Sequence, residues 1–302
     1  MTSRLKPRTD RRADRSAAVV DADELTPVQW HSSIAYKRDD LYLPFADVDL
    51  NGGKVRQAIK LVEANLPAIR KRYGSTLLTA TGVHSPQGLI IARVAALFDL
   101  SCVLFIGATS VARALTGHPM LRAAVQLGAT LDASARVAYE PALAKAVDSW
   151  RSAHSGAGFP IRFGMNLDSD PAAIVGSTAA QCANIPDDIH TVVIPVGAGI
   201  TAAGIITGCR TLRPAVQRIV CVQIAGYDRR PVIDRITPYR DYEFMSSRAY
   251  QYATHVRRYV APRFPLDPIY EAKAHEYMIR RIPIEREHTL FWVVGDSGYV
   301  RD

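Results

Sequence analysis

The sequence has only four cysteines among its 302 residues, and none of them has the close spacing of a metal site. The four are Cys102, Cys182, Cys209 and Cys221, and most of them lie in apolar stretches. This pattern argues against a disulfide framework. We therefore expect reduced core thiols in a cytoplasmic protein, and no bound metal.

The sequence also lacks an uninterrupted apolar run of membrane-spanning length. Residues 88–108 are the most apolar stretch, but Arg93 and Asp99 interrupt it. This pattern is typical of a core helix followed by a strand, and not of a membrane helix. The N-terminal region carries cations without the apolar segment of a secretory signal, so we expect neither secretion nor a membrane partner.

Internal repeats are absent as well, and the only biased segment is a basic arm at 1–20. Hydrophobic residues make up 48% of the chain and charged residues 22%, which is ordinary for a globular protein. The length suits two domains or one large α/β unit.

What the sequence does contain is a lysine directly preceded by two glycines. Residues 51–56, Asn-Gly-Gly-Lys-Val-Arg, place Lys54 on a turn directly before a helix-like run at 57–66. Glycines let the backbone approach a cofactor closely, and a lysine amine among apolar and cationic neighbours loses its proton readily enough to form a Schiff base. The motif therefore indicates a nucleophile. A surface lysine that caps a turn is the alternative, since glycine-lysine turns are common.

A second glycine motif follows a predicted buried strand at 191–195. Residues 197–204, Gly-Ala-Gly-Ile-Thr-Ala-Ala-Gly, open a helix there, and this order aims backbone N–H groups and a helix N-terminus at a phosphate. The motif is neither a Walker loop nor a full dinucleotide fingerprint, and small residues also serve plain helix-on-sheet packing. A reactive lysine together with a phosphate-binding loop is what pyridoxal 5′-phosphate (PLP) requires.

Five motifs occur in the order seen in a known enzyme family. They are Lys-Arg-Asp-Asp-Leu at 37–41, the glycine-lysine run at 52–56, Gly-Val-His-Ser-Pro-Gln at 82–87, the loop at 195–201, and Leu-Asp-Pro-Ile-Tyr-Glu-Ala-Lys-Ala at 266–274. The chain thus resembles the fold-type-II PLP enzymes of the 1-aminocyclopropane-1-carboxylate (ACC) deaminase and D-cysteine desulfhydrase branch, distant relatives of the tryptophan synthase β subunit. The resemblance extends from residue 26 to 298. It implies an α/β fold of two αβα domains with PLP in the interdomain cleft.

The resemblance also assigns roles to single residues. Lys54 is the lysine that forms the Schiff base with PLP and then acts as the base at the substrate α carbon. The phosphate loop comprises Gly197, Ala198, Gly199, Ile200 and Thr201. Ser85, with His84 and Gln87 beside it, falls where the family holds the substrate carboxylate. Tyr270 falls where the family keeps an active-site tyrosine, a second acid or base, although a core tyrosine is the alternative.

Three positions depart from the family pattern. Gly53 stands where an asparagine normally contacts the cofactor hydroxyl, Pro86 replaces an asparagine, and Ile200 replaces a glycine. These changes are compatible with PLP binding but argue against ordinary deamination of small amino acids. Near the C-terminus, Ser297 is the candidate partner of the pyridine nitrogen and Asp296 is the alternative, while both also suit a simple turn.

Periodicity predicts alternating strands and helices. A small domain should cover 54–163, and a large domain should combine 21–53 with 164–302. In the small domain we expect strands at 77–80, 102–106, 129–131 and 161–163, and helices at 87–98, 117–127 and 139–153. In the large domain we expect strands at 191–195, 219–224 and 289–294, and helices at 172–184, 199–211 and 267–280.

The net charge of +8 is unusual for an enzyme that handles only free amino acids. Six cations lie in the arm at 1–20, and residues 227–263 interleave eight arginines with six tyrosines. Guanidinium groups pair with phosphates and tyrosine rings stack on bases, so both segments predict DNA binding. A solvated tail and a homodimer interface are the competing uses of these residues.

The leading hypothesis is an isomerase or lyase that forms a carbanion at the α carbon of an amino acid attached to thymidine in DNA. In this hypothesis the chain is similar to the bacteriophage PLP enzymes of thymidine hypermodification, which convert a nitrogen-linked glycine into a carbon-linked one. The first alternative is a deaminase, desulfhydrase or racemase of a free small amino acid. The second is an inactive PLP fold that binds nucleic acid, against which an intact Lys54 counts.

Overall fold

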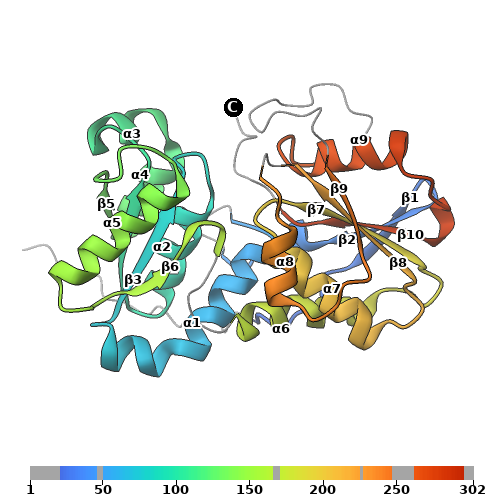
Figure 1. Ribbon diagram of the computed structural model, residues 1–302, viewed down its shortest axis with the longest axis horizontal. Coiled ribbons are helices and arrows are strands. Elements are labelled where there is room, and N and C mark those ends of the chain that lie inside the picture. The colour runs from blue at the N-terminus through green and yellow to red at the C-terminus, as the bar shows by residue number, and fades with distance from the viewer. Residues whose placement is uncertain (1–20, 46–49, 166–170, 225–226, 247–261, 296–302) are drawn as a thin grey trace, which may run out of the picture.

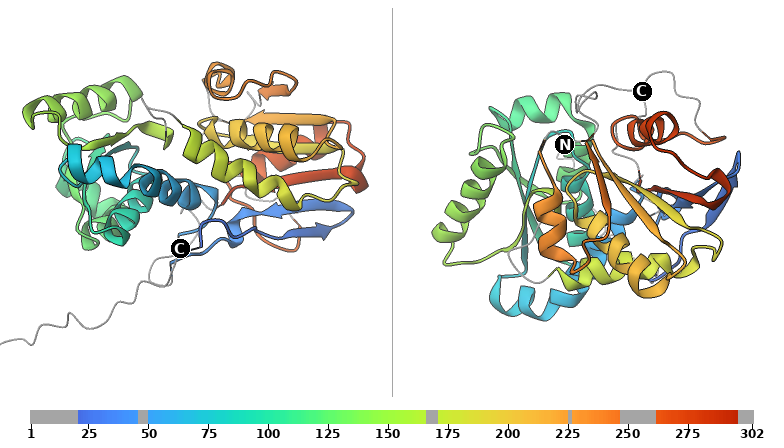
Figure 2. Two further views of the ribbon diagram at one scale, coloured as in Figure 1. Left: turned by 90° about the horizontal axis from the view of Figure 1, so that it is seen from below. Right: turned by 45° about the vertical axis from the view of Figure 1, so that its right-hand side comes forward.

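The computed structural model describes residues 21–45, 50–165, 171–224, 227–246 and 262–295, so the predicted basic arm lies outside the described residues. Two separate sheets, each with its own helices, form two lobes (Figure 1). Figure 2 shows the lobes side by side from two further directions. The predicted α/β fold is confirmed.

The larger lobe is built on a sheet with the strand order β1-β2-β10-β7-β8-β9. These strands are β1 (Val28–His31), β2 (Ile34–Arg38), β7 (Thr191–Val196), β8 (Arg218–Gln223), β9 (Glu243–Ser246) and β10 (Thr289–Val293). All neighbours are parallel except β1, which runs antiparallel to β2. A parallel sheet needs helical crossovers and is covered on both faces, so its strands are apolar on both sides.

The smaller lobe has a wholly parallel sheet with the order β5-β4-β3-β6. Its strands are β3 (Thr76–Thr81), β4 (Ser101–Ile106), β5 (Thr130–Asp132) and β6 (Phe159–Ile161). β6 therefore begins and ends two residues before the predicted strand at 161–163. The reason is the short helix η2 (Phe163–Met165), in which Gly164 has a φ of 71° and turns the chain away from the sheet.

The helices lie on both faces of each sheet. They are α1 (Gly53–Arg72), α2 (Gln87–Leu97), α3 (Val111–Gly117), α4 (Pro119–Gln126), α5 (Glu140–Ala153), α6 (Ala172–Ala180), α7 (Ile200–Leu212), α8 (Arg230–Ile236) and α9 (Glu271–Arg281). In β7, Val192 and Ile194 pack with α7, whereas Val193 packs on the opposite face with α9. This alternation follows from the two-residue repeat of a strand. The helix predicted at 117–127 is α4, which begins at Pro119, and α3 before it was not predicted.

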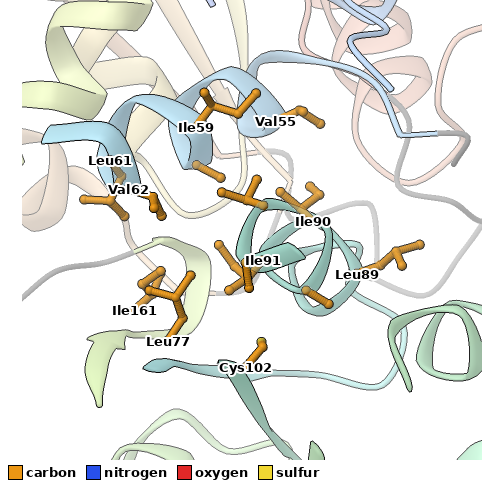
Figure 3. Close-up of a cluster of buried hydrophobic side chains, with 14 of the residues drawn as sticks. Val55, Ile59, Leu61, Val62, Leu77, Leu89, Ile90, Ile91, Cys102 and Ile161 are labelled. Carbon is orange, nitrogen blue, oxygen red and sulfur yellow. The ribbon is translucent and has the colours of Figure 1, made fainter. Parts of the chain in front are cut away.

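Helix α1 begins at Gly53, four residues before the predicted helix-like run at 57–66. Val55, Ile59 and Val62 recur at helical spacing and are fully buried against α2, including Ile90 (Figure 3). The same helix packs against α6 of the larger lobe. Its N-terminus, which carries Lys54, is therefore held by both lobes.

The four cysteines are buried free thiols, as expected. Cys182 and Cys209 lie closest, with their sulfur atoms 3.9 Å apart. None of the described helices is long and apolar enough to cross a membrane.

Candidate active site

A cleft opens where β7 and β10 end, and residues of both lobes line it. It encloses about 770 Å³, its open mouth included, which is within the range of small-molecule sites. The described residues that line it are Asn51, Lys54, Gln57, Pro86, Ile90, Gly164, Pro195, Val196, Gly197, Ala198, Gly199, Ile200, Thr201, Ala202, Tyr270, Val294 and Gly295. The cleft thus brings together the glycine-lysine motif, the predicted phosphate loop and Tyr270.

Lys54 is the second residue of α1, and the glycines before it fix its position. Gly52 has a φ of 92°, and a Cβ at this residue would lie 2.4 Å from the Val294 carbonyl oxygen, so only glycine fits. The backbone N–H of Gly53 donates to the same oxygen at 3.0 Å. This fastens the start of α1 to the end of β10.

The Lys54 amine is the one lysine amine among the described residues that line the cleft. Burial lowers its pKa, and the negative charge of Asp267 offsets part of that effect. A lowered pKa increases the fraction of neutral amine, which is the nucleophilic form. The position and the environment of Lys54 both suit the predicted role.

The predicted phosphate loop runs from the end of β7 into α7. Gly199 is the N-cap of α7 with a φ of 98°, and no side chain caps this helix. The first N–H groups of the helix are therefore available to an anion, and the helix dipole favours one. A Cβ on Gly197 would lie 2.9 Å from the Tyr270 ring. Any larger residue at this position would therefore crowd Tyr270 in the wall of the cleft.

Gln57 is a cleft residue that the sequence analysis did not identify. It lies three positions after Lys54 on α1 and therefore on the same face of the helix. Its Nε2 donates to Thr178 Oγ1 at 2.9 Å and to Thr201 Oγ1 at 3.0 Å. Its buried Oε1 has no hydrogen-bond partner among the described residues, which leaves an acceptor for a bound molecule.

Two buried acids contact residues that line the cleft, and the sequence analysis assigned neither of them a role. Glu271 accepts hydrogen bonds from the backbone N–H groups of Gly295 at 2.8 Å and Asp267 at 3.0 Å. Asp267 in turn accepts from the backbone N–H of Tyr270 at 2.8 Å. Burial, and to a lesser degree the charge of Asp267, raises the pKa of Glu271 well above its usual range. Asp296 and Ser297, the predicted partners of the pyridine nitrogen, lie outside the described residues.

The predicted substrate-binding segment is only partly at the cleft. Pro86 lines the cleft, but His84, Ser85 and Gln87 do not appear among its lining residues. Ser85 Oγ accepts a hydrogen bond from the Gln87 backbone N–H at 3.3 Å, and the His84 ring meets His118 edge-on at 4.5 Å.

The role predicted for Gln87 needs correction. Its Nε2 donates to Thr79 Oγ1 at 2.8 Å and to the Arg162 carbonyl oxygen at 2.9 Å, while its Oε1 accepts from the Met165 backbone N–H at 3.1 Å. The side chain is almost fully buried. Because its amide hydrogens already have partners inside the fold, Gln87 ties α2 to β3 and η2, and we assign it a structural role.

The residues present fit PLP. The cleft combines a lysine of lowered pKa, an uncapped helix N-terminus for a phosphate and a buried acceptor without a partner. Lys54 and residues 197–201 would hold the cofactor.

The arginines predicted to contact DNA are mostly paired with acids where the structure describes them. Arg230 lies 2.6 Å from Asp228, Arg240 lies 3.5 Å from Asp234, and Arg229 lies 3.7 Å from Glu140. Residues 247–261 lie outside the described residues. DNA binding by this segment stays a prediction.

Solved structures of other proteins share this fold, and three of them illustrate the match. An ACC deaminase homologue matches with a TM-score of 0.66 and 17% identity, over 90% of this chain and 89% of that one. O-acetyl serine sulfhydrylase isoform 3 of Entamoeba histolytica matches with a TM-score of 0.64 and 14% identity, over 99% and 92%. A PLP-dependent aspartate racemase matches with a TM-score of 0.61 and 14% identity, over 91% of both chains. The fold-type-II architecture is thereby confirmed.

Two comparisons of sequence complete the assignment. The chain is 26% identical over 193 residues to the O-seryl-dTMP PLP-dependent decarboxylase of Salmonella phage ViI, an alignment that covers 59% of this chain and 43% of the phage protein. The chain thus spans less than half the length of this curated relative. The profile of pyridoxal-phosphate dependent enzymes matches residues 19–248, which is more than half of the sequence. With Lys54 and the phosphate loop inside that match, the chain belongs to the pyridoxal-phosphate dependent enzyme family and takes PLP as its cofactor.

Proposed function

We propose that this PLP-dependent enzyme breaks a bond at the α carbon of an amino acid that is joined to a thymidine nucleotide. The observation that carries the proposal is the similarity to the phage enzyme named for O-seryl-dTMP. The net charge of +8 supports it, because a nucleotide or a DNA strand is an anion that a basic protein attracts.

The cleft residues divide the work. PLP, when bound, supplies an electron sink that stabilises negative charge at the substrate α carbon. Lys54 binds the cofactor, and its amine of lowered pKa takes a proton from the α carbon or returns one to it. The backbone N–H groups at the start of α7 hold the phosphate, while the amide of Gln57 fixes Thr201 beside them.

Tyr270 completes the proposed set as a second acid or base. It lines the same cleft as Lys54, and its ring packs against Gly197 of the phosphate loop. Its backbone is fixed by Asp267, whose carboxylate accepts from the Tyr270 N–H. A tyrosine hydroxyl can donate or accept a proton near a reacting centre.

The bond that breaks decides between a lyase and an isomerase. Decarboxylation breaks the bond to the carboxylate carbon, releases carbon dioxide and places a proton on the α carbon. The isomerisation predicted from sequence breaks two bonds, the α C–H bond and the bond between the glycine nitrogen and the thymine methylene carbon. It joins the α carbon to that methylene carbon and leaves the proton on the nitrogen, so the mass does not change. The name of the phage relative favours decarboxylation.

The test is to incubate the PLP-loaded enzyme separately with O-seryl-dTMP, with a glycine-linked thymidine nucleotide and with free serine. Mass spectrometry of the products distinguishes loss of carbon dioxide from a rearrangement without change in mass. We expect turnover of a nucleotide-linked amino acid only, and none by Lys54→Ala. Turnover of free serine with the nucleotides untouched would overturn the proposal in favour of a free amino-acid lyase or racemase. Nucleotide binding without any turnover would favour the inactive nucleic-acid-binding fold.

A further inference from the structure

The three most exposed large hydrophobic side chains of the described residues come from two loops. Tyr227 is 70% exposed, Tyr139 is 57% exposed and Val137 is 54% exposed. Tyr139 immediately precedes α5 of the smaller lobe, and Tyr227 lies shortly before α8 of the larger lobe. Single exposed side chains are common on protein surfaces, so the informative feature of these two rings is their position relative to one another and to the cleft.

An ion pair brings the two loops together. Arg229, the N-cap of α8 in the larger lobe, lies 3.7 Å from Glu140, the first residue of α5 in the smaller lobe. Tyr139 is the residue before Glu140, and Tyr227 is two residues before Arg229. The Arg229 guanidinium also lies 6.0 Å from the centre of the Tyr227 ring. The pair therefore places both exposed tyrosines at one junction of the lobes.

This junction lies next to the phosphate loop. The backbone N–H groups of Val232 and Ile233 both donate to the Arg229 carbonyl oxygen at 3.1 Å, so these residues share one helical turn with Arg229. A Cβ added at Gly199 would lie 3.3 Å from Ile233 and 3.5 Å from Val232. A molecule bound in the cleft would thus extend toward Arg229 once it is longer than a free amino acid.

The chemistry at the junction suits a nucleobase with its phosphate. An exposed tyrosine ring offers a stacking surface to a planar base, and an arginine offers a donor to a phosphate or a base carbonyl. The Nε atom of Arg229 is buried and has no hydrogen-bond partner among the described residues. The Glu140 contact is long for an ion pair, so a phosphate can compete for the guanidinium.

We propose that Tyr139, Tyr227 and Arg229 form a nucleotide clamp that holds the thymidine part of the substrate while the amino-acid part enters the cleft. The clamp rests on the proposed function, because a free amino acid has no ring to place there. In a DNA substrate the modified base leaves the stack to reach it.

The experiment measures binding of deoxythymidine monophosphate to the PLP-loaded enzyme by isothermal titration calorimetry. The variants are Tyr139→Ala, Tyr227→Ala and the double variant, with Tyr227→Phe to keep the ring. Trp30→Ala is the matched control, because Trp30 is 45% exposed but belongs to β1 at the far edge of the larger sheet. We expect about tenfold weaker binding by the double variant, and wild-type binding by Tyr227→Phe and Trp30→Ala.

Three other outcomes would overturn the clamp and differ in what else they decide. Unchanged nucleotide affinity in the double variant would remove the clamp and leave the proposed function standing. Failure of the wild-type enzyme to bind the nucleotide, together with turnover of free serine, would remove both. Dissociation of an oligomer by Tyr139→Ala or Tyr227→Ala, measured by light scattering, would assign these rings to a subunit interface instead.

Discussion

The Asp39 carboxylate accepts a hydrogen bond from the indole nitrogen of Trp292 at 3.0 Å, and both side chains are buried. The same carboxylate accepts from Thr26 Oγ1 at 2.7 Å and lies 3.4 Å from the Arg56 guanidinium. A Cβ at Gly53 would lie 3.0 Å from Asp39. Asp39 therefore connects β10 to the first turn of α1, which carries the cleft residue Lys54.

Asp39→Asn is expected to destabilise the protein by about 3–5 kcal/mol, because it leaves the buried charge of Arg56 without its counter-ion. Urea unfolding measures the loss. The matched control is Asp187→Asn, which breaks the pair with Arg213 at a side chain that is 91% exposed. It should cost less than about 1 kcal/mol. Equal costs for the two variants would contradict a structural role for the buried pair.

Borohydride reduction followed by peptide mapping is expected to place the cofactor on Lys54. Two other buried lysines make this a demanding test, since burial also lowers the pKa of Lys37, to about 8, and of Lys273. Neither of them lines the cleft. Lys54→Ala should abolish the visible absorption of the bound cofactor, and an adduct on Lys37 or Lys273 would refute the assignment.

The sequence predicted those strands that are uninterrupted apolar runs, because such runs indicate burial on both faces of a sheet. The apolar run at 191–195 differs from β7 by one residue. β2 was not predicted, because it contains Lys37 and Arg38, yet all five of its residues are buried. Lys37 tolerates burial because its amine donates to Asn184 Oδ1 at 2.6 Å, and Asn184 is 147 residues away in the chain. No local pattern carries that information.

The same distinction holds for the candidate site. Lys54 and the loop at 197–201 could be predicted because glycines at close spacing mark places where the backbone approaches a ligand. The start of α1 was misplaced because Gly53 suggests a turn, whereas the positive φ belongs to Gly52. Gln57 and Glu271 could not be predicted, because their roles depend on partners such as Thr178 and Gly295 that are distant in sequence.

Gly199→Ala is expected to raise the dissociation constant of PLP about tenfold or more. Its φ of 98° is costly for any residue with a Cβ, so the N–H groups at the start of α7 lose their alignment with the phosphate. The control is Gly176→Ala in α6, where a Cβ would have open space. Equilibrium dialysis of PLP measures both. An unchanged constant for Gly199→Ala would exclude this loop as the phosphate site.

Deletion of residues 1–15 is expected to weaken binding to duplex DNA while the absorption spectrum of the bound cofactor stays the same. The segment contains six cations, and each phosphate contact that is lost should flatten the dependence of log affinity on log salt by about one. Fluorescence anisotropy at several salt concentrations gives the slope. DNA binding that is undetectable at low salt, or that does not change with salt, would contradict the predicted partner.

Stability at acid pH is expected to depend on His275. Its ring is buried and lies 2.7 Å from the Tyr36 hydroxyl, and burial, with a smaller effect of Arg286, lowers its pKa from 6.5 to about 4. Between these two values the unfolded chain binds a proton that the folded chain does not. The contribution of His275 to the free energy of unfolding is therefore fully present above pH 6.5. It falls by up to about 1.4 kcal/mol per pH unit as the pH drops toward 4.

His275→Gln should remove this contribution, so that urea unfolding from pH 7 to pH 4 shows a shallower loss of stability than in the wild-type protein. Glutamine does not titrate and can still hydrogen-bond to Tyr36. His154→Gln is the matched control, because His154 is exposed at the end of α5 and should leave the wild-type slope unchanged. If His275→Gln keeps the wild-type slope, His275 takes up its proton in the folded state as readily as in the unfolded chain, and the ring is not held neutral by burial.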